Sequence, residues 1–88
     1  MHSSENAIVL TRHAEAKIAE RGLRLAWVHR AARNPDLTEE EPRDPSAERR
    51  FARIPEFGGH YLRVVCVETD EVIPVITATF DRSAKFEP

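Results

Sequence analysis

Residues 11–23 read TRHAEAKIAERGL, and this stretch carries the clearest helix signals in the chain. The Thr11 hydroxyl is a good N-cap, and Gly22 supplies the left-handed residue that commonly follows a helix. Leu23 can then fold back on Ile18 to complete the C-terminal cap. The sequence therefore predicts a helix that begins after Thr11 and ends just before Gly22.

Two stripes run along this predicted helix. The apolar stripe has the four-residue spacing of a buried helix face and consists of Leu10, Ala14 and Ile18. The stripe beside it is polar, and its members are His13, Lys17 and Arg21. Three cationic groups in this arrangement repel one another unless an anion or an acidic neighbour compensates them.

A second helix is expected over residues 25–33, because Pro35 prevents it from continuing. Its buried side chains are expected to be Leu25, Val28, Ala31 and Ala32, with Trp27 at the margin. The short connection between the helices predicts a helix hairpin. Residues 1–6 form a polar tail, and residues 7–10 are either a brief strand or the hydrophobic staple before the first helix.

Acidic residues dominate the next segment. Six of them lie between residues 36 and 48, where Arg43 is the only basic residue. Leu37 is nearly the only apolar side chain there, which predicts an exposed acidic loop at residues 36–47. Outside this segment basic residues outnumber acidic ones, and most are arginines, whose planar fork suits phosphate.

Beyond the acidic segment the sequence pattern becomes extended. Strands are expected at residues 49–54, 60–68 and 72–80, with turns at residues 58–59 and 69–70. Pro74 cannot donate to a strand ladder, which predicts an edge strand or a bulge there.

The second turn also predicts how the last two strands pair. It places Arg63 opposite Ile76 and Tyr61 opposite Ala78, all on an open face of the sheet. The helices are expected to cover the more apolar face, which holds Leu62, Val64, Cys66, Ile73 and Val75.

These elements predict one α+β domain over residues 1–88, with a core at about residues 8–82. Two N-terminal helices pack as a hairpin on one face of a three- to four-stranded antiparallel sheet. A chain of 88 residues with 41% hydrophobic content can build one such core, but not a second domain or a large cavity.

Several classes of chemistry lack their signatures. The sequence has no glycine-rich phosphate loop and no HExxH motif, and no two histidines have the spacing of a helical metal site. Cys66 is the only cysteine, which excludes an intramolecular disulfide and fits a reducing compartment. The apolar stretches are too short to span a membrane, and no secretory signal begins the chain. We therefore expect a cytoplasmic protein that needs neither a metal nor a cofactor.

The polar stripe of the first helix is one candidate site. His13 would lie in the first turn, where the helix dipole disfavours the imidazolium and favours a neutral, base-competent ring. Lys17 and Arg21 would extend the site as cations. A solvated helix face with one exposed histidine is an equally good interpretation of these residues alone.

The predicted sheet supplies a second basic set. Its arginines are Arg49, Arg50, Arg53 and Arg63, and His60 and Tyr61 lie between the last two. Alternation sends Arg49 and Arg53 to one face and Arg50 to the other. This mixture suits RNA cleavage, in which a base activates the 2′-hydroxyl, an acid protonates the leaving oxygen and a cation stabilises the phosphorane. It equally suits a strand that merely borders solvent.

The order of motifs resembles a known family. His13, the Arg-Gly pair at residues 21–22, Val28 and the Asn-Pro pair at residues 34–35 resemble the opening of the domain-of-unknown-function 4258 family. The later strands, with Leu-Arg-Val-Val at residues 62–65 and Val-Ile-Thr at residues 75–77, also resemble that family. The sequence departs from the family pattern where Lys17 replaces an arginine and Arg24 replaces a small N-cap residue.

The family is in turn similar to the RelE- and BrnT-like toxins, small folds that include metal-independent ribonucleases. The resemblance implies an endoribonuclease toxin with RNA as substrate and an antitoxin protein as partner. The strand that begins at Val72 could serve as an edge for dimerisation, with Pro74 acting against it, so we expect a monomer or weak homodimer. The predicted catalytic residues are His13, Arg21 and Arg63, and the predicted substrate-binding residues are Lys17, Arg50, Arg53, His60 and Tyr61. The alternative is a non-catalytic module that binds protein or RNA through exposed Trp27 or Phe80 and the acidic loop.

Overall fold

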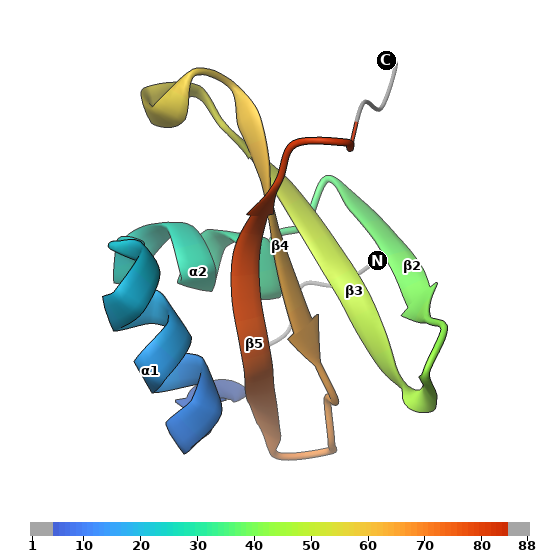
Figure 1. Ribbon diagram of the computed structural model, residues 1–88. Helices are drawn as coiled ribbons and strands as arrows, with labels where there is room; N and C mark the ends of the chain where they lie inside the picture. Colours follow the sequence, from blue (N-terminus) through green and yellow to red (C-terminus); the bar gives the residue numbers. More distant parts are fainter. Residues whose placement is uncertain (1–4, 85–88) are drawn as a thin grey trace.

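The chain folds around one mixed sheet, seen in a computed structural model that describes residues 5–84. Its elements in chain order are β1 (Ala7–Leu10), α1 (Arg12–Arg21), α2 (Leu25–Arg33), β2 (Leu37–Glu41), β3 (Asp44–Ile54), the short 3-10 helix η1 (Pro55–Phe57), β4 (His60–Cys66) and β5 (Val72–Asp81). The strand order is β1-β5-β4-β3-β2 (Figure 1). The α+β class is thus confirmed, but the sheet has five strands, and β1 runs parallel to β5.

The caps of α1 match the sequence prediction. The Thr11 hydroxyl accepts a hydrogen bond from the Ala14 amide at 3.1 Å, which satisfies one of the free donors of the first turn. Gly22 adopts a left-handed conformation with φ 63°, and the Leu23 amide donates to the Ile18 carbonyl at 3.0 Å. These bonds end α1 where the sequence indicates.

The start and the end of α1 are tied to the edge of β5. Because β1 pairs with β5 only over residues 72–75, the rest of that edge would otherwise be open. The Thr11 amide donates to the Val75 carbonyl, and the Thr11 hydroxyl donates to the Ile76 carbonyl at 3.3 Å. Further along, the Arg21 guanidinium donates to the Ala78 carbonyl at 2.8 Å. α1 therefore closes an edge that could pair with another chain.

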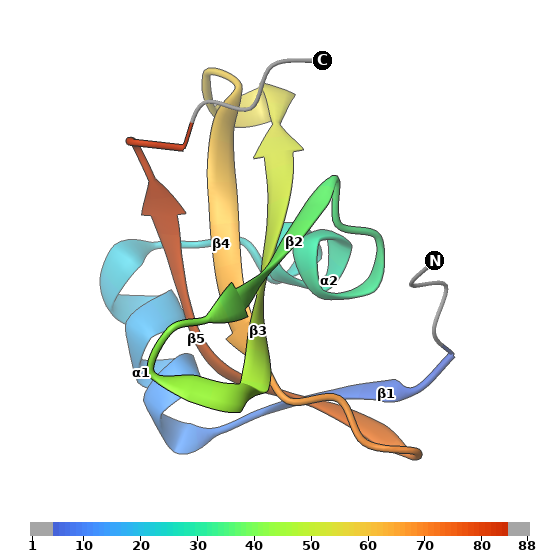
Figure 2. The same cartoon turned by 90° about the vertical axis from the view of Figure 1, so that its right-hand side faces the viewer.

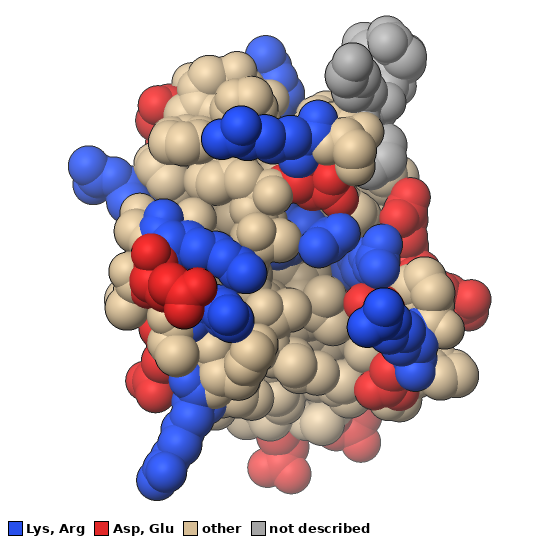
Figure 3. All heavy atoms as spheres, viewed as in Figure 1, with Lys and Arg blue, Asp and Glu red and all other residues tan. Residues whose placement is uncertain are grey.

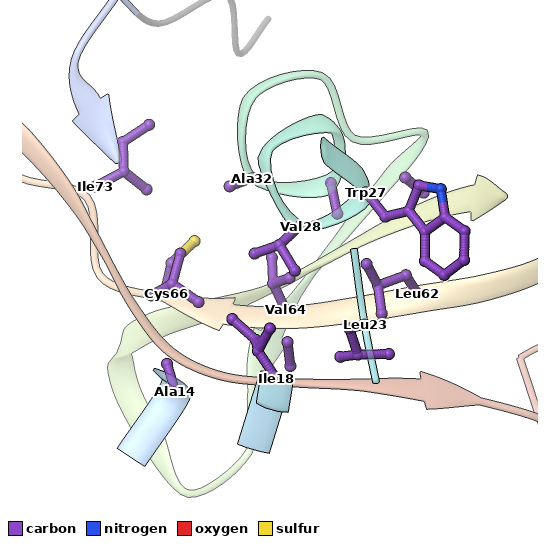
Figure 4. Packing of buried hydrophobic residues seen from close by; sticks show 14 of the residues in the cluster. Ala14, Ile18, Leu23, Trp27, Val28, Ala32, Leu62, Val64, Cys66 and Ile73 are labelled. Atoms are coloured by element: carbon purple, nitrogen blue, oxygen red, sulfur yellow. The ribbon is translucent and has the colours of Figure 1, made fainter. Parts of the chain in front are cut away.

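The core lies between the helices and one face of the sheet. α1 packs mainly on β5, and α2 packs on β3 and β4. Figure 4 shows Val28 of α2 and Ile18 of α1 meeting around Val64 of β4. The predicted apolar face is confirmed, since Leu62, Val64, Cys66, Ile73 and Val75 are all buried.

Three details of the helix prediction are wrong. The two helices contact different strands and are not primarily packed on each other as a hairpin (Figure 2). Leu25 is 52% exposed, because it begins α2 on the side away from the sheet. Trp27 is only 8% exposed, so it belongs to the core and is not a marginal or exposed residue.

The acidic segment is a β-hairpin and not a loop. Residues 37–41 form β2, and β3 begins at Asp44, earlier than the sequence predicts. Arg49 offsets part of the acidic charge: Glu39 lies opposite Arg49, and Glu41 makes an ion pair with the same arginine, although Glu40 lies opposite Glu48. The first apolar run also has a definite outcome, since residues 7–10 form β1.

The predicted pairing of β4 with β5 is wrong by three residues. Arg63 lies opposite Thr79, and Val64 lies opposite Ala78, because β4 already ends at Cys66 and the connection to β5 is longer than two residues. The register also shifts between Val65 and Cys66. Ala78 consequently faces the core, where it is fully buried.

The sequence predicts either a sheet edge or a bulge at Pro74, and the sheet edge is wrong. Pro74 pairs with Val9 of β1 on one side, and its carbonyl accepts a hydrogen bond from the Val67 amide on the other. The shift of register lies just beyond it in β5.

Candidate functional site

The face of the sheet away from the helices carries most of the predicted sheet residues. On β3, Arg49 and Arg53 alternate with buried Arg50 and Ala52, so they project to the side away from the helices, as Phe51 does, although Phe51 is itself buried. On β4, Tyr61 and Arg63 alternate in the same way with Leu62 and Val64. We call this side of the sheet the open face.

Register brings these side chains close together. Arg53 lies opposite Tyr61, and Arg49 lies opposite Val65, so Arg63 is the diagonal neighbour of Arg49 on the next strand. Cβ atoms at such positions are about 7–8 Å apart, within reach of one bound group for two arginine side chains. Thr79, opposite Arg63 on β5, continues the same face.

The open face is hollowed over β3, β4 and β5. The hollow has a volume of about 540 Å³ and is lined by Glu41, Arg43, Asp44, Ala47, Arg49, Arg63, Val65, Ile76 and Thr77. In Figure 3, basic and acidic side chains lie together near β2 and β3 at the right and over α1 at the left. A ligand of the hollow would meet guanidinium groups with carboxylates beside them, and a small apolar floor.

Arg63 is hydrogen-bonded to the carboxylate of Asp81. Its Nη1 donates to Asp81 at 3.0 Å, and the two side chains are 27% and 15% exposed. The pKa of Asp81 is lowered, chiefly by the hydrogen bond from the Ser83 hydroxyl and also by the charge of Arg63. Arg63 Nε is buried and has no hydrogen-bond acceptor within residues 5–84. One edge of this guanidinium thus has unused donor capacity.

Arg49 is held in a similar way from the β2 side. Its Nε and Nη2 donate to the two oxygens of Glu41 at 3.2 and 3.3 Å. This hydrogen bonding lowers the pKa of Glu41, so the carboxylate stays ionised. Each arginine of the pair is therefore oriented by one acid, an arrangement that sequence reasoning missed. The alternation of β3 in the sequence indicates where the arginines project. Their partner acids are not indicated, because Glu41 falls in the predicted loop and Asp81 lies just beyond the predicted last strand.

The polar stripe of α1 lies elsewhere. His13 is exposed and does not line the hollow. Lys17 makes an ion pair with Glu20 at 3.5 Å, and Arg21 donates to the β5 edge. The polar stripe of α1 therefore lies along the edge of β5 that faces away from β4. Arg49 and Arg63 lie on the other side of β5, on β3 and β4.

Arg50 is placed differently from its predicted substrate-binding role. Its side chain is 1% exposed and donates to the Ala32 carbonyl at 2.6 Å and to Glu68 at 2.7 Å. Burial opposes its charge, but the hydrogen bonds to Glu68 and Glu48 outweigh burial and raise the pKa of Arg50. The guanidinium of Arg50 is buried and hydrogen-bonded within the protein, so it is not accessible to a ligand.

His60 is also separate from Arg63. It lies on the helix-covered side at the start of β4, with its ring centroid 5.8 Å from that of Phe57 and 6.4 Å from that of Phe80. Arg53 remains exposed, and its guanidinium lies against Gly59, where a Cβ atom would come within 2.6 Å of Nη2. Of the predicted site residues, the open face thus brings together Arg53, Tyr61 and Arg63.

Other kinds of site find little support in the described part of the chain. Residues 5–84 contain no group of three or more His, Cys, Asp and Glu side chains that could hold a metal ion. Burial raises the pKa of the Cys66 thiol to about 11, so this thiol stays protonated at neutral pH. Neither α1 nor α2 has the length and apolar content that a membrane-crossing helix requires.

The fold and the open face define a small α+β domain with a pair of carboxylate-paired arginines on the sheet face away from the helices. The chain belongs to the family described as a domain of unknown function, DUF4258, whose family model matches residues 10–80. No curated protein and no solved structure matches the chain.

Proposed function

We propose that this protein is a metal-independent endoribonuclease that holds the scissile phosphate of RNA between Arg49 and Arg63. The observation that carries the proposal is the diagonal placement of these two side chains over one hollow. Two planar guanidinium groups can donate to the nonbridging oxygens of one phosphodiester.

The reaction needs no group beyond the RNA and the protein side chains. The 2′-oxygen loses its proton to a base and attacks the adjacent phosphorus, and the bond from phosphorus to the 5′-oxygen breaks. An acid protonates that leaving oxygen, which yields a 2′,3′-cyclic phosphate and a 5′-hydroxyl end. The two arginines stabilise the negative charge that builds up on the phosphorane.

Two groups outside the lining of the hollow are candidates for proton transfer. Tyr61 projects from the open face, opposite Arg53 and Asp81. His13 lies in the first turn of α1, two residues after Thr11, whose hydroxyl donates to the carbonyl of Ile76, a residue that lines the hollow. An RNA strand that crosses β5 would meet the α1 stripe and the paired arginines, so we propose His13 as base and Tyr61 as acid.

The toxin assignment rests on the resemblance to RelE- and BrnT-like proteins. We propose that an antitoxin partner inhibits the enzyme by covering the open face, which is where RNA would bind. An acidic partner segment would compete for Arg49 and Arg63 as Glu41 and Asp81 already do.

Cleavage of synthetic RNA in excess EDTA tests the proposal. The wild-type protein should cleave a single-stranded RNA and leave a cyclic phosphate, and a 2′-deoxy substitution at the cleaved position should block the reaction. Arg49→Ala and Arg63→Ala should each reduce the rate at least tenfold with a near-normal melting temperature. Arg33→Ala is a matched control, because Arg33 ends α2 and does not line the hollow. Cleavage by Arg49→Ala and Arg63→Ala at the wild-type rate would contradict the proposal.

A non-catalytic RNA-binding module is the second candidate. It is favoured by the carboxylates of the open face: Glu41 and Asp81 both have lowered pKa values and are therefore weak bases. RNA binding that depends on Arg49 and Arg63 without any cleavage would support this module over the enzyme.

A further inference from the structure

An aromatic cluster lies outside the hollow, where η1 meets α2 and the end of β5. The rings of Phe57 and Phe80 are stacked, with centroids 4.4 Å apart and planes within 18° of parallel. Trp27 packs against both, at 5.8 Å from each centroid, and His60 completes the group. We call these four side chains the aromatic cluster; none of them lines the hollow.

Phe57 is the exposed member of the cluster. It remains 44% exposed although Phe80 stacks on its ring and Trp27 and His60 contact it, so part of Phe57 is accessible to a ligand. An exposed aromatic ring backed by a second, parallel ring can accept a further flat group in continuation of the stack.

The backbone around Phe57 is held in place. Pro55 begins η1, and Gly58 ends it in a left-handed conformation with φ 62°. The Gly59 amide then donates to the Ile54 carbonyl at 3.0 Å, which closes the turn. Phe57 is therefore presented on a short, closed loop at the end of the sheet.

A salt bridge anchors this loop to α2. Arg30 donates to both oxygens of Glu56, at 3.3 and 3.0 Å. The exposed ring is thus fixed before any ligand arrives, which reduces the entropy cost of binding.

A cationic group borders the cluster. The Arg24 guanidinium lies 5.8 Å from the centroid of the Trp27 ring, and the polar ring of His60 is exposed beside Phe57. Aromatic rings bordered by cations are the usual surface for unpaired nucleobases, since the ring stacks on the base while the cations attract the phosphates. A purely apolar peptide would make no polar interaction with Arg24 or His60.

We propose that the aromatic cluster binds an unpaired nucleobase of single-stranded RNA, stacked on the accessible part of Phe57. The proposal rests on the proposed function in naming RNA as the ligand, and it restricts that ligand to single-stranded regions. A base within a duplex is already stacked on both sides and cannot reach Phe57.

Trp27, the only tryptophan of the chain, is a built-in reporter for this test because its ring lies 5.8 Å from that of Phe57. Titration with a seven-nucleotide single-stranded RNA should change the Trp27 fluorescence until it saturates. An oligomer with the same backbone but with abasic sites should leave the Trp27 fluorescence unchanged. Phe57→Ala and Phe57→Leu should each weaken RNA binding roughly tenfold, because leucine keeps the apolar bulk but has no flat ring. Val9→Ala, at a similarly exposed apolar residue of β1, is the control and should bind as the wild type does.

Two further results separate this proposal from the proposed function. The double variant Arg49→Ala, Arg63→Ala tests the open face alone: unchanged RNA affinity would overturn the proposed function while the Trp27 response persists. Adenosine, which has no phosphate, tests the cluster alone and should shift the Phe57 ring resonances in NMR spectra. The stacking proposal is overturned if RNA binds without a Trp27 response, if Phe57→Leu binds as tightly as the wild type, or if adenosine causes no shift.

Discussion

The guanidinium of Arg50 donates a hydrogen bond of 2.6 Å to the carbonyl of Ala32, which joins the middle of β3 to the last turn of α2. The last carbonyls of a helix have no partner within it, and a cation stabilises this negative end. The same guanidinium reaches Glu68, beyond β4, at 2.7 Å. One buried side chain thus links a helix, a strand and the connection that leads to β5.

Replacing Arg50 should destabilise the fold severely. Arg50→Ala leaves the Ala32 carbonyl without its donor and leaves two carboxylates facing a cavity. The expected loss is about 3 kcal/mol in the free energy of unfolding, near the lower end for a broken buried ion pair. The lower end applies because Glu48 and Glu68 are 31% and 20% exposed and can be solvated in part. Urea denaturation measures this loss.

Arg50→Lys separates charge from geometry in the same experiment. Lysine restores the cation but cannot donate to three separate acceptors from a planar fork, so it should recover less than half of the loss. Arg43→Ala, at an exposed arginine in the β2–β3 turn, should change stability by no more than about 0.5 kcal/mol. A stable Arg50→Ala protein would show that the buried guanidinium is not a structural link.

Thr11→Ala tests how α1 is attached to the sheet. The hydroxyl caps the Ala14 amide and also donates to the Ile76 carbonyl, so its loss removes a helix cap and a bond to the β5 edge. We expect a loss of about 1–2 kcal/mol in the free energy of unfolding. Thr11→Ser keeps both bonds and should lose far less. Similar thermal denaturation of all three proteins would contradict this dual role.

Local signals explain which parts of the fold could be predicted from the sequence. The cap of Thr11 and the left-handed turn of Gly22 act within a few residues, so the bounds of α1 follow from neighbouring side chains alone. The apolar alternation of residues 62, 64 and 66 likewise identifies the buried face of β4.

Nonlocal pairing explains what the sequence did not show. The acidic residues of β2 look unfavourable for a strand, and the contacts of Arg49 with Glu39 and Glu41 that offset their charge depend on the folded sheet. The partners of Arg50 are likewise distant, since Ala32 and Glu68 are each 18 residues away along the chain. Alternation along β3 places Arg50 on the face opposite Arg49. Only the position of α2 shows that this face is buried and therefore inaccessible to ligands.

The glycine turn before β4 offers a test of backbone strain. Gly59 has φ 73°, and a Cβ atom there would meet the Arg53 guanidinium at 2.6 Å, whereas Gly22 has φ 63° and open space around it. Gly22→Ala should cost about 1 kcal/mol from backbone conformation alone. Gly59→Ala should cost somewhat more. Because the clash is with the end of a flexible side chain, Arg53→Ala should remove the excess in a double-mutant cycle. Additive effects of the two substitutions would show that Arg53 does not restrict this turn.

The Glu56 carboxylate should titrate far below its ordinary range. The hydrogen bonds from Arg30 are the main cause, and they lower the pKa of Glu56 from 4.5 to about 2. Because the folded-state pKa is depressed, the stabilisation is present above about pH 4.5 and is lost as the pH falls from there toward 2. Carboxyl NMR signals should show the low pKa in the wild type and a value much nearer 4.5 in Arg30→Ala. Arg33→Ala should leave the Glu56 titration unchanged; a wild-type value near 4.5 would mean that the ion pair does not persist in solution.

Asp81 should act as a competitor of RNA for Arg63. The carboxylate holds Arg63 Nη1 at 3.0 Å, so a phosphate must displace it or share the guanidinium with it. Asp81→Asn removes one negative charge from the edge of the open face and should tighten RNA binding several-fold. Arg63→Ala should weaken binding and reduce the slope of log affinity against log salt by about 0.7, the value for one lost phosphate contact on single-stranded nucleic acid. Arg63→Lys should restore the slope but not the full affinity, because lysine keeps the charge and loses the fork. Binding measured by fluorescence anisotropy at several salt concentrations distinguishes these cases. If Asp81→Asn weakens binding instead, the carboxylate orients Arg63 for the phosphate more than it competes with it.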